Sequence, residues 1–245
     1  MEFRGIMGGF YRISEWIMRL SVTNLLWIIT AFPVFFFVLT IFMAQDVAQL
    51  QSALFAIVIL SPFTLFPSTS AMFALARKWV MGDADVPLLK TFFRGYKENY
   101  LQSMVGGIIF TLLFTILYFN FQFYNTQTGY LVLLAYLFIA LGVVLAISLF
   151  YFFCIMTHLH MKLFTLIKNS ILLAIGMPFR SIMIVLSNFA ILYISFTQFT
   201  FLLPFFTGSV MAYLTFWYFY GGFMKMMDKH EKMKAEAEEA EEAQK

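Results

Sequence analysis

The chain alternates between long apolar stretches without charge and short polar connections. The stretches contain no Asp, Glu, Lys or Arg, and one such charge at the centre of a membrane helix costs about 2.5–3.5 kcal/mol on the insertion scale. Stretches of about 20 residues match a hydrocarbon core about 30 Å thick. The pattern therefore predicts six transmembrane helices, at Leu20–Met43, Ser52–Ala76, Leu101–Phe123, Tyr130–Thr157, Ser181–Leu203 and Phe205–Met224.

The basic residues give an independent prediction of the topology. With six crossings, all 16 Lys and Arg residues, from Arg4 to Lys245, fall on one side of the membrane. The three opposite connections, near Asp46, Asn125 and Phe206, contain none. Since basic residues are enriched in cytoplasmic segments, we expect both termini in the cytoplasm. The predicted fold class is an all-α, polytopic transmembrane helix bundle.

Composition supports a membrane protein and narrows its partners. Of the residues, 62% are hydrophobic and 12% are charged, against about 25% charged in ordinary soluble domains. The net charge of +3 is spread over several segments, which argues against nucleic acid and leaves membrane lipids as the expected surroundings. The sequence predicts a transmembrane domain over 1–224 and a charged cytoplasmic tail over 225–245. A single cysteine, Cys154, excludes an intramolecular disulfide.

Three segments on the predicted cytoplasmic side are amphipathic at helical spacing: 6–20, 89–100 and 162–176. In the second, aromatic residues oppose Lys90, Arg94 and Lys97. One interpretation places these helices in the anionic inner-leaflet interface. The alternative is docking to a cytoplasmic partner through the apolar face, for which the candidate residues are Phe92, Phe93 and Tyr96.

Polar residues within the second predicted span form the best candidate site. Two prolines, Pro62 and Pro67, free backbone carbonyls and should bend this helix. Broken helices of this kind offer backbone dipoles and hydroxyls to substrates in some transporters. The alternative is that the hydroxyls satisfy the bent backbone or pack between helices. The hydroxyl-bearing candidates are Ser61, Thr64, Ser68, Thr69 and Ser70.

Amide side chains in other spans could join the same polar interior. Asn24 lies in the first span, and Asn188 and Gln198 lie in the fifth. We expect Asn24 to need a hydrogen-bond partner and to face the Ser/Thr-rich part of span two. Interhelical hydrogen bonds are worth only about 0.6–2 kcal/mol, so a structural role is as strong an interpretation as ligand binding.

The sequence lacks the motifs that usually mark proton relays, nucleotide binding and metal binding. The spans contain no carboxylate for a proton relay, and the chain has neither a P-loop nor a dinucleotide glycine fingerprint. His158 and His160 lie two residues apart, but no further metal ligands cluster nearby in the sequence. We therefore expect a protein that is not an enzyme and has no cofactor or metal site.

The sequence resembles the YesL family of bacterial membrane proteins. The matching elements are Asn24-Leu25-Leu26-Trp27 with Pro33, Pro67-Ser68-Thr69-Ser70-Ala71-Met72 leading to Lys78 and Gly82, and Phe92-Phe93 with Tyr96-Lys97-Glu98-Asn99-Tyr100. The resemblance implies a bacterial cell membrane and a setting of binding-protein-dependent sugar uptake and polysaccharide degradation. It supplies no catalytic residues.

Three functions remain open on these grounds. The first is an accessory or permease-like component associated with carbohydrate ABC uptake, whose partners would be ABC transporter subunits and a sugar. The second is an autonomous small-solute transporter that uses the bent second span. The third is an assembly or structural factor that transports nothing. The sequence does not indicate an oligomeric state.

Overall fold

A computed structural model describes residues 6–242, and these contain helices but no strand. Arg4 and Lys245 of the charge pattern lie outside the described residues. The all-α prediction is confirmed. In chain order the helices are α1 (Ile6–Thr30), α2 (Phe32–Met43), α3 (Val47–Leu60), α4 (Leu65–Val80), α5 (Leu88–Asn125), the 3-10 turn η1 (Gly129–Leu131), α6 (Val132–His158), α7 (Leu163–Gly176), α8 (Pro178–Thr197), α9 (Leu202–Phe205) and α10 (Thr207–Glu242).

Several of these helices have the length and hydropathy of membrane spans. Three are long and apolar enough to cross a membrane: α5, the segment Gly129–His158 and α8. Two bent pairs, α1 with α2 and α3 with α4, pass the same test together. The sixth predicted span forms the first half of α10. It carries no charge, but its glycines, tyrosines and tryptophan lower its mean hydropathy, so the count of six stays a prediction.

Proline accounts for both bends. Pro33 is the second residue of α2, where it cannot donate a hydrogen bond to the end of α1, and the axes of α1 and α2 differ by 85°. Pro62 lies in the break between α3 and α4, which differ by 56°, and Pro67 lies in the first turn of α4. The predicted bend in the second span is confirmed. The bent backbone faces the protein interior, because Ser68 and Ser70 are fully buried.

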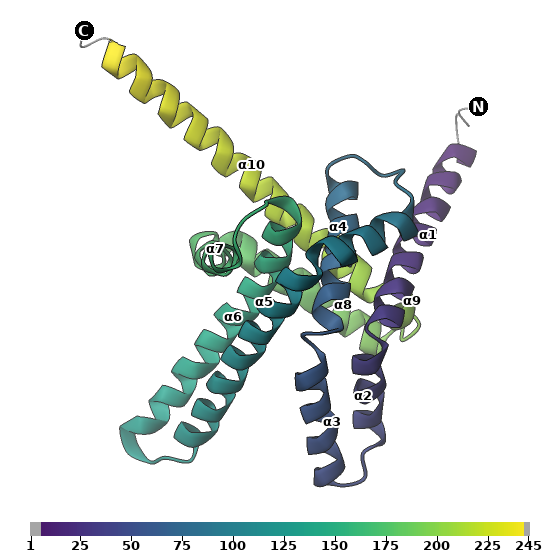
Figure 1. Cartoon of the computed structure of the whole chain (residues 1–245), viewed down its shortest axis with the longest axis vertical. Coiled ribbons are helices and arrows are strands. Elements are labelled where there is room, and N and C mark those ends of the chain that lie inside the picture. Colours follow the sequence, from purple (N-terminus) through teal and green to yellow (C-terminus); the bar gives the residue numbers. More distant parts are fainter. Residues whose placement is uncertain (1–5, 243–245) are drawn as a thin grey trace.

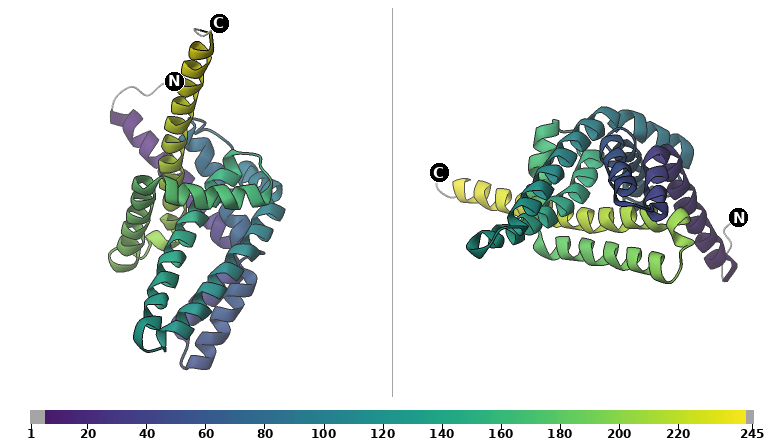
Figure 2. Two further views of the ribbon diagram at one scale, coloured as in Figure 1. Left: turned by 90° about the vertical axis from the view of Figure 1, so that its left-hand side faces the viewer. Right: turned by 90° about the horizontal axis from the view of Figure 1, so that it is seen from below.

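The connections without basic residues do not all lie at one level. The loops around Asp46 and Asn125 lie at the lower end of Figure 1, and the start of α1, the end of α10 and the α4–α5 loop lie at the upper end. The third connection, at α9, lies midway, and α2 and α3 extend well below it. Seen from below, α8 and α10 run side by side across the bundle (Figure 2). A turn at this depth needs protein partners for its backbone.

The three amphipathic segments take different forms. Residues 6–20 and 89–100 are the opening turns of α1 and α5 and run without a break into these long helices. Residues 162–176 instead form the separate helix α7, which Figure 1 shows end-on beside the upper half of α6. A helix lying across the spans near one end of the bundle fits the interfacial interpretation. Its exposed Phe164 and buried Leu166 separate an outer from an inner face.

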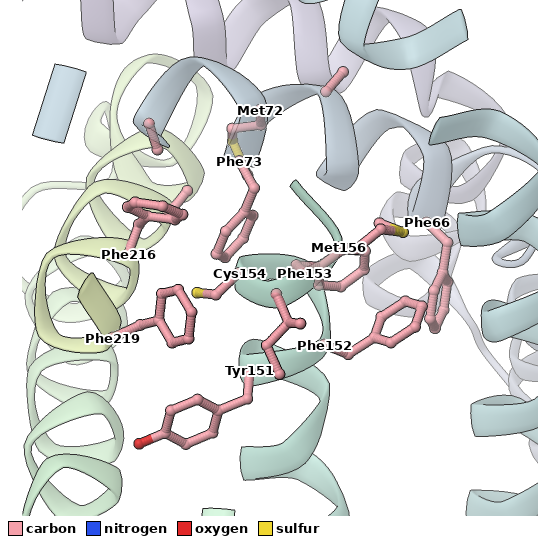
Figure 3. Packing of buried hydrophobic residues seen from close by; sticks show 14 of the residues in the cluster. Phe66, Met72, Phe73, Tyr151, Phe152, Phe153, Cys154, Met156, Phe216 and Phe219 are labelled. Atoms are coloured by element: carbon pink, nitrogen blue, oxygen red, sulfur yellow. The ribbon is translucent and has the colours of Figure 1, made fainter. Parts of the chain in front are cut away.

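Aromatic side chains from α4, α6 and α10 form the core of the upper half. Phe73 stacks on Phe153 with ring centroids 5.5 Å apart, and Phe216 meets Phe219 at 5.6 Å (Figure 3). Small residues let α5 approach this core closely. A Cβ atom added to Gly107 would lie 2.7 Å from the Phe66 ring and 3.0 Å from the Pro62 backbone.

Candidate functional site

Asn24 joins α1 to α9 and the first residues of α10, a connection that we call the α9–α10 turn (residues 202–209). Its amide nitrogen donates to the carbonyl oxygens of Leu203 at 3.1 Å and Pro204 at 2.7 Å, and its amide oxygen accepts from the Ser209 N–H at 3.0 Å. The Ser209 N–H is one of the first donors of α10, which have no partner within their own helix. Asn24 itself is fully buried. It therefore satisfies irregular backbone at the mid-level connection, where water could not do so.

Trp27, one turn beyond Asn24, connects the same junction to α4. Its indole N–H donates to the Thr69 hydroxyl at 3.0 Å. Its ring also packs against Gly208, where an added Cβ would lie 2.7 Å from the ring and 2.9 Å from the Asn24 amide oxygen. Glycine is needed here for close approach, not for an unusual backbone conformation. Asn24, Trp27, Thr69, Gly208 and Ser209 thus form one structural unit, which we call the helix-break junction.

The hydroxyls of the second predicted span bond mainly to their own helix. Each donates to a carbonyl three or four residues earlier: Ser61 to Ile57, Thr64 to Leu60, Ser68 to Thr64, Thr69 to Leu65 and Ser70 to Pro67. Such bonds are typical of serine and threonine near bent helices. Thr69 in addition accepts a hydrogen bond from another helix, from the indole N–H of Trp27. This geometry favours the packing interpretation over a substrate site.

Asn188 and Gln198 do not reach the helix-break junction. The Asn188 amide nitrogen donates to the Thr215 hydroxyl of α10 at 3.0 Å, and Gln198 is exposed at the end of α8. The eight polar residues that were predicted to share one interior thus lie in three separate places: on α1 and the second predicted span, on α8 against α10, and at the exposed end of α8. Asn24 also bonds to the α9–α10 turn and not to the Ser/Thr-rich part of span two, because this turn brings three unpaired backbone groups to its amide.

A row of polar contacts between α8 and its neighbours, which we call the polar seam, was not predicted from the sequence. Ser195 meets Thr207 at 2.8 Å, Asn188 meets Thr215, and Ser181 meets Tyr151 at 3.3 Å. These three α8 residues recur every seven positions, a spacing that places them on one helix face. That repeat could have been found in the sequence. The seam joins α8 to α10 and α6, and among its atoms the Asn188 amide oxygen is buried without a hydrogen-bond partner.

The three candidate docking residues differ in their exposure. Phe92 is fully buried, so a partner cannot reach it, and this part of the docking prediction is corrected. The reason is that α5 packs tightly on α4 at Gly95, where an added Cβ would lie 2.8 Å from the Ala74 side chain. Phe93 is 51% exposed, and Tyr96 is half-buried against Tyr100.

A buried cation near the upper end of the bundle was also missed. Arg19 is only 5% exposed, forms ion pairs with Glu15 and Asp85, and lies over the Trp16 ring at 5.6 Å. Arg19 lies in the amphipathic segment 6–20, whose pattern gave no indication that it would be buried. Asp85 belongs to the α4–α5 loop, so the contact joins this loop to α1. A cavity of about 520 Å³ lies beside it.

The histidines do not build a metal site. His158 is surrounded by the rings of Phe216, Phe219, Tyr220 and Phe223, and Arg77 lies 3.4 Å from its Nδ1 atom. His160 is exposed. Across the part of the chain that the structure describes, no three His, Cys, Asp or Glu residues gather closely enough to hold a metal ion.

The chain is similar to a family of proteins of unknown function and to several bacterial proteins. A family described as "Protein of unknown function, DUF624" matches residues 20–121. The chain is 28% identical to the uncharacterized protein YteU of Bacillus subtilis (strain 168) over 87% of this chain and 84% of YteU. It is 26% identical to YesL of the same organism, over 96% of this chain and 99% of YesL. The resemblance to the YesL family is confirmed.

A third relative, YesV of Bacillus subtilis (strain 168), is 29% identical over 67% of this chain and 79% of YesV. No solved structure matches significantly. The family match includes Asn24, Trp27 and Thr69 but ends before α9 and α10. The part of the chain that the family model matches therefore supplies one side of the helix-break junction, and the helices after it supply the other, whereas the similarity to YesL extends over both.

Proposed function

We propose that this protein is a non-enzymatic accessory or permease-like component of the bacterial cell membrane that works with subunits of a carbohydrate ABC uptake system. In this proposal the chain crosses the membrane six times with both termini in the cytoplasm. The link to carbohydrate uptake rests on the resemblance to the YesL family. Because the sequence has no P-loop, ATP hydrolysis would have to come from a partner.

The accessory role is supported by the hydrogen bonding of the polar side chains, most of which are already bonded within the protein. In the structure, the hydroxyls of the bent second span bond to their own backbone, and Asn24 bonds to the α9–α10 turn. A transporter that works alone needs polar groups free to replace the hydration of a small solute. Side chains already bonded within the protein supply few of these, which supports a component that acts with partners.

The surface best suited to a cytoplasmic partner is the start of α5. Lys90, Arg94 and Lys97 are exposed there, and Phe93 presents half of its ring between them. Arg94 bonds to Glu98 at 2.8 Å on the exposed surface. Exposed aromatic rings beside basic groups are common in protein interfaces, and such groups also suit anionic lipid headgroups.

Purification from native membranes tests the proposal. We expect an ABC transporter ATPase to co-purify with the full chain, and Phe93→Ala to release it if the start of α5 is the docking surface, because buried aromatics dominate interface energies. Phe119→Ala is the matched control, since Phe119 is exposed near the opposite end of α5. Exchange of Lys90, Arg94 and Lys97 for glutamine tests the attraction to lipid. If these residues only contact headgroups, the exchange should weaken membrane attraction by about 1 kcal/mol per charge and leave the co-purified proteins unchanged.

Other outcomes would contradict the proposal in different ways. A protein that purifies alone and moves sugar into liposomes would be an autonomous transporter. One that purifies alone and moves nothing would favour an assembly or structural factor. A partner retained by the Phe93 and basic-residue variants would remove α5 as the docking surface and leave α7 as the remaining candidate.

A further inference from the structure

A small apolar cavity lies beside the helix-break junction. Its volume is about 180 Å³, and its walls come from α1, α4 and α6. The lining residues are Trp27, Leu65, Phe66, Thr69, Phe73, Leu149, Phe150 and Phe153. Five of these eight are aromatic. In Figure 1 the α2–α3 hairpin and the lower halves of α5 and α6 diverge below this level.

The polar atoms of the lining are already paired. The Trp27 indole N–H donates to the Thr69 hydroxyl, and that hydroxyl donates to the Leu65 carbonyl at 2.7 Å. An ordered water in a cavity typically needs 2–4 hydrogen-bond partners, and apolar cavities without them stay dry. A sugar or an ion would likewise lose its hydration without replacement. The chemistry of the walls therefore selects a hydrocarbon.

The cavity has a rim that lipid can reach and a buried back wall. Trp27, Leu65, Leu149 and Phe150 are half-buried, whereas Phe73 and Phe153 are only 3% and 4% exposed. The two back-wall rings stack on each other (Figure 3). The walls belong to helices with the hydropathy of membrane spans, so the surrounding solvent at the rim is the lipid chain region.

We propose that this cavity binds a hydrocarbon chain segment of a membrane lipid, inserted from the side between α1, α4 and α6. A cavity of about 150 Å³ holds one benzene molecule, so this one accommodates roughly six carbon atoms of a chain. An inserted chain restores the dispersion contacts that an empty cavity forfeits. The inference does not depend on the proposed role in sugar uptake.

Photo-crosslinking in vesicles tests the site with the full chain. The vesicles contain phosphatidylethanolamine and phosphatidylglycerol, with a small fraction of phosphatidylglycerol that carries a diazirine in the middle of an acyl chain. We expect adducts on Phe73 and Phe153, which lipid around the protein cannot touch. Phe119 and Phe189 are 65% and 66% exposed and report general lipid contact.

A cavity-filling variant makes the test specific. Leu149→Phe enlarges a wall residue and should abolish the Phe73 and Phe153 adducts while leaving those on Phe119 and Phe189. Leu65→Phe fills the cavity from the opposite side, in case the first variant does not fold. Leu112→Phe, at a residue 57% exposed, is the matched control and should change nothing.

Competition identifies the source of the chain. Loss of the back-wall adducts with a small amount of unlabelled polyprenyl phosphate would indicate an isoprenoid chain, and persistence would indicate a phospholipid acyl chain. The proposal is overturned if adducts form on the exposed phenylalanines but not on Phe73 and Phe153. It is also overturned if both cavity-filling variants fold and keep the back-wall adducts.

Discussion

Replacement of Asn24 by leucine is expected to lower the free energy of unfolding by about 2–4 kcal/mol, because three buried backbone groups lose their partner at once. Leucine has a similar size, so the change leaves little cavity. It strands the carbonyls of Leu203 and Pro204 and the N–H of Ser209. Equilibrium unfolding in mixed detergent micelles, followed by circular dichroism, measures the loss.

Asn120→Leu is the control for this experiment. Asn120 also lies in a long membrane-type helix, α5. Its amide donates to the Ile116 carbonyl one turn earlier, and this carbonyl keeps its place in the backbone hydrogen bonding of the helix when the amide is removed. Its loss should be small. Equal destabilisation by the two variants would mean that Asn24 does not hold the α9–α10 turn, and the helix-break junction would lose its main argument.

Replacement of Gly107 by alanine is the second change with a large expected effect. The added methyl group would meet the Phe66 ring at 2.7 Å and the Pro62 backbone at 3.0 Å. The nearest ring atom is Cγ of Phe66, which rotation of the ring does not move, and the backbone of the α3–α4 break cannot retreat easily. We therefore expect a loss of about 1–3 kcal/mol, as for other overpacked cores. The same unfolding measurement applies.

Gly142→Ala separates this steric effect from a general effect of alanine. Gly142 lies within α6, and an added Cβ there would meet nothing within 4 Å. Alanine favours helix over glycine by up to about 1 kcal/mol, so this variant should be as stable as the parent or more so. If Gly107→Ala behaved the same way, α5 would not pack on the α3–α4 break as described.

Features set by neighbouring residues could be predicted from the sequence. Charge-free stretches gave the positions of the membrane-type helices, and Pro62 and Pro67 gave the bend in the second span. The serines after that bend were expected either to line a site or to satisfy the backbone, and hydrogen bonding to carbonyls three or four residues earlier is a local geometry that favours the second. Periodicity also marked residues 89–100 as helical.

Features set by distant partners could not be predicted. The carbonyls that Asn24 bonds lie about 180 positions along the chain, and nothing near Asn24 identifies them. Phe92 has the same local pattern as Phe93, yet contact with α4 buries one and leaves the other exposed. The burial of Arg19 could not be predicted, because nothing in the sequence indicates that the α4–α5 loop brings Asp85 to it.

The most direct test of the membrane architecture is the location of Lys225, which follows the least hydrophobic of the six predicted spans. Fusions of a cytoplasmic and an extracytoplasmic reporter after Phe123, Lys162 and Lys225 would place each point on one side. We expect Phe123 outside and both lysines in the cytoplasm, because all 16 basic residues then share one side. An extracytoplasmic signal at Lys225 would contradict the six-span topology.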